Sequence, residues 1–191
     1  MKRLAFLTLL VPFFASAANT WWFERVDQEL KTSSTLSEFG YSAQTPDSAS
    51  FTFKYASKPV RAWVKTGQGQ DAVFAFDDLT GQQSYATLTD GQWVIGQGMM
   101  MDVMQKMHRR GNLIAGNTKR DAHLSQDKSM IELVSQIENN RAEFTVLKAK
   151  KMGTGLGDSY LTISLDGVAS ADDAQKIFTV LRPVIERQTE F

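Results

Sequence analysis

The sequence has no cysteine and only two histidines, His108 and His123, in a chain of 191 residues. The absence of cysteine excludes disulfides, thiol catalysis, zinc–thiolate sites, covalent haem attachment and a lipid carried on a thiol. Neither histidine lies in a nucleophile elbow or belongs to a pair with metal-ligand spacing. We therefore expect a protein without enzymatic activity and without a cofactor. A hydrolase whose site is assembled from scattered residues is the enzymatic alternative.

The chain also lacks a surplus of either charge, because it has 21 Lys and Arg residues against 21 Asp and Glu residues. Proteins that bind nucleic acid or anionic membranes usually carry a basic surplus or a basic patch. The balance gives no electrostatic reason to expect either partner. The hydrophobic content of 42% is that of an ordinary globular domain.

Long hydrophobic runs are absent except near the N-terminus, where one extends from Leu4 to Phe14. Two basic residues precede this run, and the small residues Ala15-Ser16-Ala17 follow it, as signal peptidase requires. The run is too short for a membrane-spanning helix, which needs about 20 apolar residues. The pattern predicts a cleavable bacterial signal peptide at residues 1–17, export to the periplasm or beyond, and no membrane span.

Residues 18–191 contain no repeat and no low-complexity linker, which favours a single globular domain. Alternating apolar residues predict strands, and the short segments Gly67 to Gln70 and Asp90-Gly91 fit hairpin turns between neighbouring strands. The strands are expected at 50–56, 60–65, 72–76, 84–88, 93–95, 144–147 and 160–165. The pattern indicates an α+β protein with a largely antiparallel sheet or sandwich.

About three helices are expected in addition. Residues 99–109 have apolar side chains at helical spacing. Ser129 and Glu132 fit a capping box that would open a helix ending at Asn139-Asn140. The segment from Ser170 to Asp173 caps a final helix, in which Pro183 should cause a kink or a break.

Three stretches of the C-terminal half resemble the invasion-associated locus B family of exported bacterial proteins. They read HLSQDKSMIELVSQIENN, FTVLKAK and YLTISLDGVASADDAQ, in that order. In that family a helix precedes a strand, and a second strand ends in a turn of small residues that leads into an alanine-containing helix. The resemblance implies a β-rich periplasmic module without an assigned catalytic residue. Members of the family usually carry cysteines, which this chain lacks.

The segment from Met99 to His108 is the one candidate metal site. Thioether and imidazole groups are soft ligands that suit Cu(I), and Met101, Met104 and His108 would share one face of a helix. Methionines at helical spacing also fill hydrophobic cores, because the unbranched thioether adapts to irregular space. Both interpretations remain open from the sequence.

The aromatic run Trp21, Trp22 and Phe23 at the expected mature N-terminus is the candidate partner-binding site. Large aromatic side chains anchor protein interfaces, although they also contribute most when they are buried in the protein's own core. We therefore expect a non-enzymatic periplasmic protein that binds another macromolecule, as an inhibitor, an immunity factor or an envelope accessory. A periplasmic carrier of a small ligand or of Cu(I), using the Met99–His108 helix, is the alternative.

Overall fold

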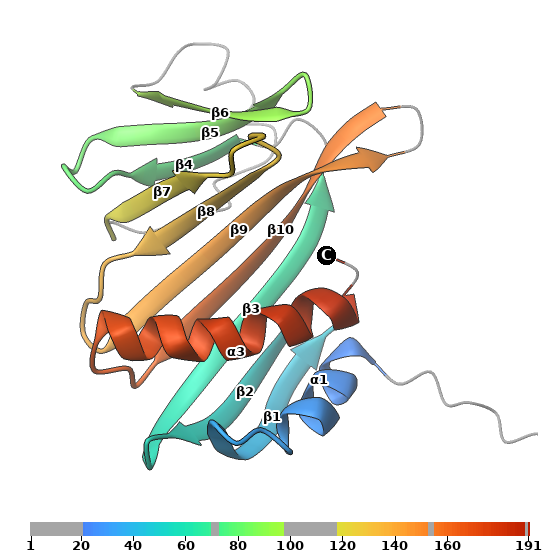
Figure 1. Ribbon diagram of the computed structural model, residues 1–191, viewed down its shortest axis with the longest axis vertical. Coiled ribbons are helices and arrows are strands. Elements are labelled where there is room, and N and C mark those ends of the chain that lie inside the picture. Colours follow the sequence, from blue (N-terminus) through green and yellow to red (C-terminus); the bar gives the residue numbers. More distant parts are fainter. Residues whose placement is uncertain (1–20, 70–72, 98–117, 153–154, 190) are drawn as a thin grey trace, which may run out of the picture.

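The computed structural model describes residues 21–69, 73–97, 118–152, 155–189 and 191. Two helices occur in this part of the chain, α1 (Trp22–Leu30) and α3 (Ala171–Thr189). The strands are β1 (Leu36–Thr45), β2 (Ser48–Tyr55), β3 (Lys58–Gly69), β4 (Val73–Asp77), β5 (Gln83–Thr89), β6 (Gln92–Gln97), β7 (Arg120–Leu124), β8 (Met130–Ser135), β9 (Arg141–Met152) and β10 (Gly155–Asp166) (Figure 1). The predicted β-rich α+β class is therefore confirmed.

Seven strands form one antiparallel sheet in the order β1-β2-β3-β10-β9-β8-β7, and β4, β5 and β6 form a separate antiparallel sheet. Most neighbours in the large sheet are consecutive hairpins, whereas β10 returns across the sheet to pair with β3. A parallel bridge between Asp78 and Arg120 joins the end of β4 to the start of β7. The strands that are far apart in sequence thus meet at the β3–β10 pair, in the middle of the large sheet.

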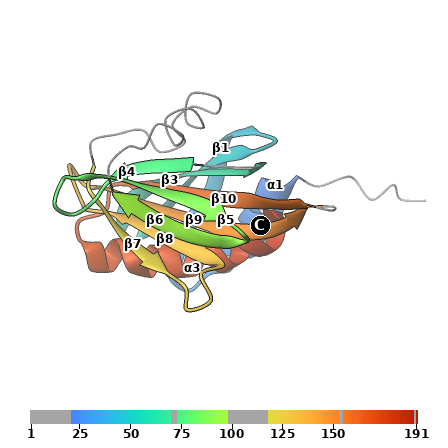
Figure 2. The same cartoon turned by 90° about the horizontal axis from the view of Figure 1, so that it is seen from above.

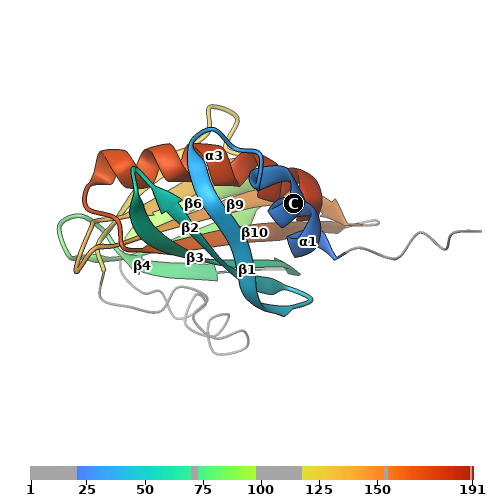
Figure 3. The ribbon, with the colours of Figure 1, turned by 90° about the horizontal axis from the view of Figure 1, so that it is seen from below.

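One face of the large sheet is covered by α1 and α3, which lie on the same side of it (Figure 3). Strand residues alternate between the two faces, so every second side chain points towards the helices. Phe144 on β9 stacks on Phe178 of α3, with ring centroids 4.2 Å apart. Each such buried aromatic or aliphatic side chain contributes roughly 1.5–3 kcal/mol by leaving water. Others in this core are Val26, Phe51, Phe53, Ala62, Val64, Leu161, Ile163 and Leu181.

A second core lies between the two sheets. Phe74 and Trp93 of the small sheet are buried against Ile131, Leu133 and Leu147 of β8 and β9. These strand residues project from the face opposite the helices, and in Figure 2 α3 and β4 lie on opposite sides of β9 and β10. Strands β8 and β9 are therefore buried on both faces.

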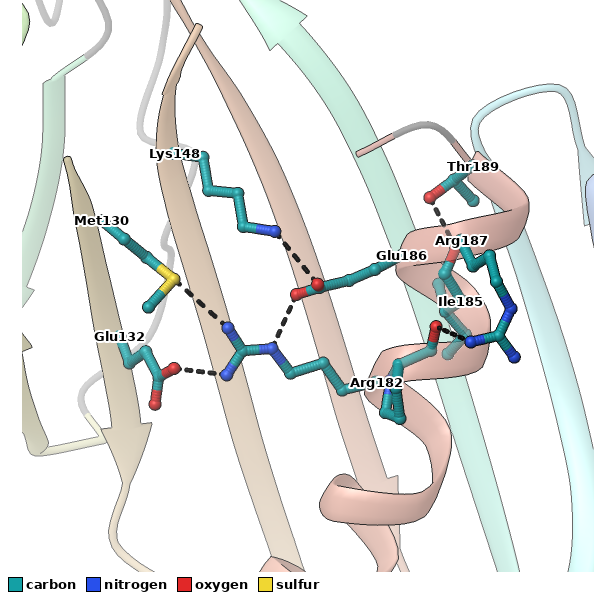
Figure 4. A network of polar contacts seen from close by, with 9 residues as sticks. Met130, Glu132, Lys148, Arg182, Ile185, Glu186, Arg187 and Thr189 are labelled. Carbon is teal, nitrogen blue, oxygen red and sulfur yellow. Dashed lines mark hydrogen bonds and ion pairs between the residues drawn. The ribbon is translucent and has the colours of Figure 1, made fainter. Parts of the chain in front are cut away.

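Polar contacts attach α3 to these same strands (Figure 4). Arg182 pairs with Glu132 of β8 and donates from Nε to Glu186 over 2.6 Å, while Lys148 of β9 lies 3.0 Å from Glu186. Burial alone would lower the pKa of Arg182, but hydrogen bonds to Glu186 and Glu132 outweigh it and raise the pKa. The guanidinium also contacts the Met130 sulfur at 3.2 Å. This network orients the helix across the strands.

Several local predictions are confirmed. The segment at 50–56 is β2, and Asp90-Gly91 forms the β5–β6 hairpin turn, with φ of 49° and 78°. Positive φ at both positions is the requirement of a type I′ turn. The backbone N–H of Asp173 donates to Ser170 Oγ over 3.1 Å, so Ser170 caps α3 as expected. The helix runs through Pro183 as one element, so a break at that position is not observed.

The helix predicted to begin after Ser129 is wrong, because Met130–Ser135 is the strand β8. Its apolar residues fit both the helical and the strand period, but burial alternates along the segment. Ile131, Leu133 and Ser135 are buried on the face of the sheet opposite the helices. Ser129 does not cap a helix; its hydroxyl donates to Asp127 over 2.8 Å in the β7–β8 turn. The described residues therefore hold two helices rather than about three, and the segment 99–109 lies outside them.

The hairpin predicted around Gly67 is also wrong. Strand β3 continues through Gly67 to Gly69 and pairs with β10, whereas β4 opens the other sheet. Glycine serves a different purpose here: a Cβ at Gly67 would lie 2.4 Å from Cε1 of Tyr160, whose ring covers it. The elements α1, β1 and β7 are additional to those predicted from the sequence.

Candidate binding groove

Polar side chains gather on the helix-free face of the large sheet, beyond the part that packs against the small sheet. Strand pairing aligns them in two neighbouring rows. In one row Glu143, Ser164 and Trp63 are direct cross-strand partners on β9, β10 and β3. In the next row Arg141 and Arg61 flank Asp166 in the same way. Direct partners in a sheet have Cβ atoms about 5 Å apart, so each row forms a continuous line of side chains.

A hollow on this face, lined by described residues, has a volume of about 500 Å³. It lies over the first row and the end of β8, and we call it the Arg120 hollow. Its lining combines charged, hydroxyl and amide groups with one aromatic ring; it includes Trp63, Arg120, Ser135, Asn139, Glu143 and Ser164. Such a lining is more polar than that of most small-molecule sites.

A hydrogen-bonded network fixes the floor of the Arg120 hollow. The Arg120 side chain is 3% exposed, pairs with Glu143 and donates to the Thr118 carbonyl over 3.0 Å. The Ser164 hydroxyl donates to the other Glu143 oxygen over 3.0 Å, and the Glu143 backbone N–H donates to Ser135 Oγ over 2.7 Å. Both carboxylate oxygens are therefore engaged, which holds the group in one orientation.

The second hollow, with a volume of about 460 Å³, lies beside the first and is called the Lys54 hollow. Lys54 on β2 forms an ion pair of 2.6 Å with Glu38 on β1 at its far side. Arg61 and Asp166 line its near side, and Asp166 also lines the Arg120 hollow. Because the two hollows share this residue, they adjoin each other.

Trp63 lines the Arg120 hollow, as does Asp166, the residue that the two hollows share. Trp63 is 42% exposed, which is unusual for so large a side chain, and the Arg61 guanidinium lies over its ring at 5.4 Å from the centroid. A cation over an aromatic face at an exposed site stabilises the arrangement by about 0.5–1 kcal/mol. We call the two hollows together with Arg61 and Trp63 the Trp63 groove.

The residues of the N-terminal aromatic run have different surroundings. Trp21 is 53% exposed and precedes α1, whereas Trp22 and Phe23 are buried in the core under the helices. The Trp22 indole donates to the Pro46 carbonyl over 2.9 Å, and the Trp21 and Phe23 rings stack at 6.0 Å. Of the three, Trp21 therefore offers the most surface to a partner.

The candidate copper ligands Met101, Met104 and His108 lie outside the described residues. Within the ranges that the structure describes, no group of three or more His, Cys, Asp or Glu side chains is placed to hold a metal ion. His123 on β7 is exposed, lies 3.2 Å from Asp121 and does not line either of the two hollows described above.

Two further acidic residues anchor turns. Asp127 accepts hydrogen bonds from the Ser125 hydroxyl and from the backbone and hydroxyl of Ser129, and these lower its pKa from 3.8 to about 2. The Thr80 hydroxyl and nearby backbone N–H groups lower the pKa of Asp78 in the β4–β5 turn. Both carboxylates stabilise local backbone geometry, and neither is a lining residue of the two hollows.

The groove residues were not singled out from the sequence. The strand predicted at 60–65 did place Arg61 and Trp63 on one face, and a tryptophan on a charged face was the available signal. Arg120 and Glu143 are 23 positions apart and meet only because β7, β8 and β9 form consecutive hairpins. No local pattern could have indicated that pair.

Comparisons with protein-family models, curated proteins and solved structures gave no significant match to this chain. None of the described helices has both the length and the apolar character that a membrane crossing requires. The site must therefore be interpreted from its own geometry.

Proposed function

We propose that this chain is a non-enzymatic exported protein that binds another macromolecule in the bacterial cell envelope. The Trp63 groove is the observation that carries this proposal. It combines an exposed tryptophan with two adjoining hollows, and tryptophan is among the residues that contribute most at binding interfaces. The pattern of residues 1–17 supports export and delivery to the periplasm or beyond.

The arrangement of groups favours binding over catalysis. The Glu143 carboxylate in the Arg120 hollow accepts hydrogen bonds at both oxygens, from Arg120 and from Ser164. Each oxygen keeps a second lone pair, but the carboxylate is already oriented by these two partners. Prepositioned groups of this kind instead provide a rigid surface, which reduces the entropy lost when a ligand binds.

The resemblance to the invasion-associated locus B family supports an envelope location, although the first of the three stretches forms β7 and β8 rather than a helix. The inhibitor, immunity and accessory roles all require a stoichiometric partner, so a single experiment addresses them together. A Cu(I) or small-ligand carrier using Met99–His108 remains the alternative. It predicts metal bound under reducing conditions and lost when Met101, Met104 and His108 are replaced.

The test is native mass spectrometry of the untagged mature chain, isolated under reducing conditions from the envelope fraction of its own host. We expect a macromolecular addition in stoichiometric amount, retained in Trp21→Ala and lost in Trp63→Ala. Loss in Trp21→Ala alone would move the site to the N-terminal aromatic residues. A bare monomer from both the wild-type chain and the variants would contradict the proposal.

A further inference from the structure

The Trp63 groove is long enough for several units of a polymer. Its lining comes from six strands that are adjacent in the sheet, in the order β8-β9-β10-β3-β2-β1. Neighbouring strands lie about 4.8 Å apart, so five spacings give a length of roughly 24 Å across the strands. One lining residue from each strand, in this order, is Ser135, Glu143, Ser164, Trp63, Thr52 and Glu38. A single small metabolite would occupy only part of this length.

The charges of the groove are balanced and largely paired. Its lining holds four basic side chains, Lys54, Arg61, Arg120 and Arg141, and four acidic ones, Glu38, Glu138, Glu143 and Asp166. Sites for nucleic acids or other polyanions need a basic surplus, because counterion release supplies most of the affinity. A polycation would need the opposite surplus. The balance therefore favours an uncharged polymer.

A polypeptide partner fits this surface less well. The main-chain groups of β3, β9 and β10 are already paired in the sheet, so a peptide cannot add to them as a further strand. The centre of a protein interface is usually depleted of charged residues, whereas this groove is lined by them. Recognition must therefore come from side chains. Asp166 accepts hydrogen bonds, Arg141 donates them, and the Asn139 amide does both.

Hydroxyl groups match this mixture, since each one donates and accepts a hydrogen bond. A pyranose ring carries hydroxyls around its edge and C–H groups on its faces. The exposed ring of Trp63 offers an apolar surface for such a face, and the carboxylates and guanidinium groups on both sides offer partners for the edge. We propose that the macromolecule bound in the Trp63 groove is an uncharged polysaccharide chain, a conclusion that rests on the proposed binding function.

Isothermal titration calorimetry of the mature chain with cellohexaose, chitohexaose and maltohexaose tests this proposal, with heparin as the polyanion. We expect at least one neutral hexasaccharide to bind, with an affinity that changes little between about 50 mM and about 200 mM salt, because no counterions are released. Trp63→Ala should weaken binding by at least about tenfold, and Trp63→Phe should restore part of it. Leu124→Ala is the matched control, because Leu124 is 39% exposed and lies outside both linings.

Absence of binding by all three neutral sugars would overturn the glycan assignment, and so would salt-sensitive binding of heparin alone. Equal sugar binding by Trp63→Ala and by the wild-type chain would show that the sugar does not bind in the Trp63 groove. These results are distinct from failure of the proposed function. A protein captured by the wild-type chain but not by Trp63→Ala would leave macromolecular binding at the groove standing and refute the polysaccharide.

Discussion

Replacement of Glu143 by alanine should destabilise the protein through the charge that it leaves behind. Arg120 is 3% exposed at its side chain, whereas Glu143 is 29% exposed. Removing one partner of a buried ion pair typically costs about 3–5 kcal/mol, because the other charge stays buried without compensation. In Glu143→Ala the Arg120 guanidinium would keep its hydrogen bond to the Thr118 carbonyl, and water from the hollow could reach it. We therefore expect a loss at the lower end of that range, about 3 kcal/mol in the free energy of unfolding.

Urea denaturation of the mature chain, followed by far-ultraviolet circular dichroism, measures this loss. In a chain of this size, about 3 kcal/mol corresponds to a decrease of roughly 6–12 °C in Tm. The combined variant Arg120→Met/Glu143→Leu should regain most of the stability, since no buried charge remains. Lys54→Ala breaks the exposed pair with Glu38 in the same groove and should cost less than about 1 kcal/mol. If Glu143→Ala costs no more than Lys54→Ala, the reasoning about the buried charge is refuted.

Three further predictions concern the backbone and one turn. Gly167→Ala should cost at least about 1–3 kcal/mol in denaturant unfolding, because φ is +94° there and a Cβ would lie 2.5 Å from the Pro59 carbonyl oxygen; wild-type stability would contradict this. Pro183→Ala should raise Tm, since Pro183 is exposed inside α3 and proline is about 3 kcal/mol less favourable than alanine in a helix interior; an unchanged or lower Tm would argue against it. Ser125→Ala should raise the Asp127 pKa from about 2 towards 3.8 in a carbon-13 NMR titration. The depressed folded-state pKa means that the ionised carboxylate contributes stability above about pH 4, and that this is lost as the pH falls through about 2; a value that stays near 2 in the variant would exclude the hydroxyl as the main cause.

Much of the fold could be predicted where short-range signals are sufficient. The alternation at 50–56, the Asp90-Gly91 turn and the capped helix after Ser170 each depend on a few neighbouring residues. These features formed as predicted because turn geometry, side-chain alternation and capping act locally. The glycine at 67 shows the limit, since the ring of Tyr160 that covers it lies on another strand.

Strand β8 shows why the period of a short apolar segment can mislead. Ile131 and Val134 are spaced as on one helix face, while Ile131 and Leu133 are spaced as on one strand face. The choice is made by the neighbours: β7 and β9 supply main-chain partners on both sides, and the small sheet buries Ile131 and Leu133. Tertiary packing thus decided between two patterns that the sequence permits about equally.

The candidate site was harder to predict than the fold because it depends on strand register. Trp63 and Glu143 each lie directly opposite Ser164, but only once the β3–β10 and β9–β10 registers are known. Glu143 and Ser164 are ordinary strand residues when each is taken alone, and only the exposed tryptophan is unusual. They form a candidate site only because the strand register places them in one row.

The same alternation links the groove to the core. Val64 and Ile163 point into the helix-side core while their neighbours Trp63 and Ser164 point into the groove, so a slip of one residue would exchange the two faces. The core therefore fixes the register that builds the groove, and the exposed side chains of the groove add little to stability in return. Trp63 illustrates this, because its exposed ring gains little from folding and its contact with Arg61 contributes only about 0.5–1 kcal/mol. It follows that Trp63→Ala should leave the fold intact while removing the largest apolar surface of the groove. A loss of binding in that variant can thus be attributed to the site itself.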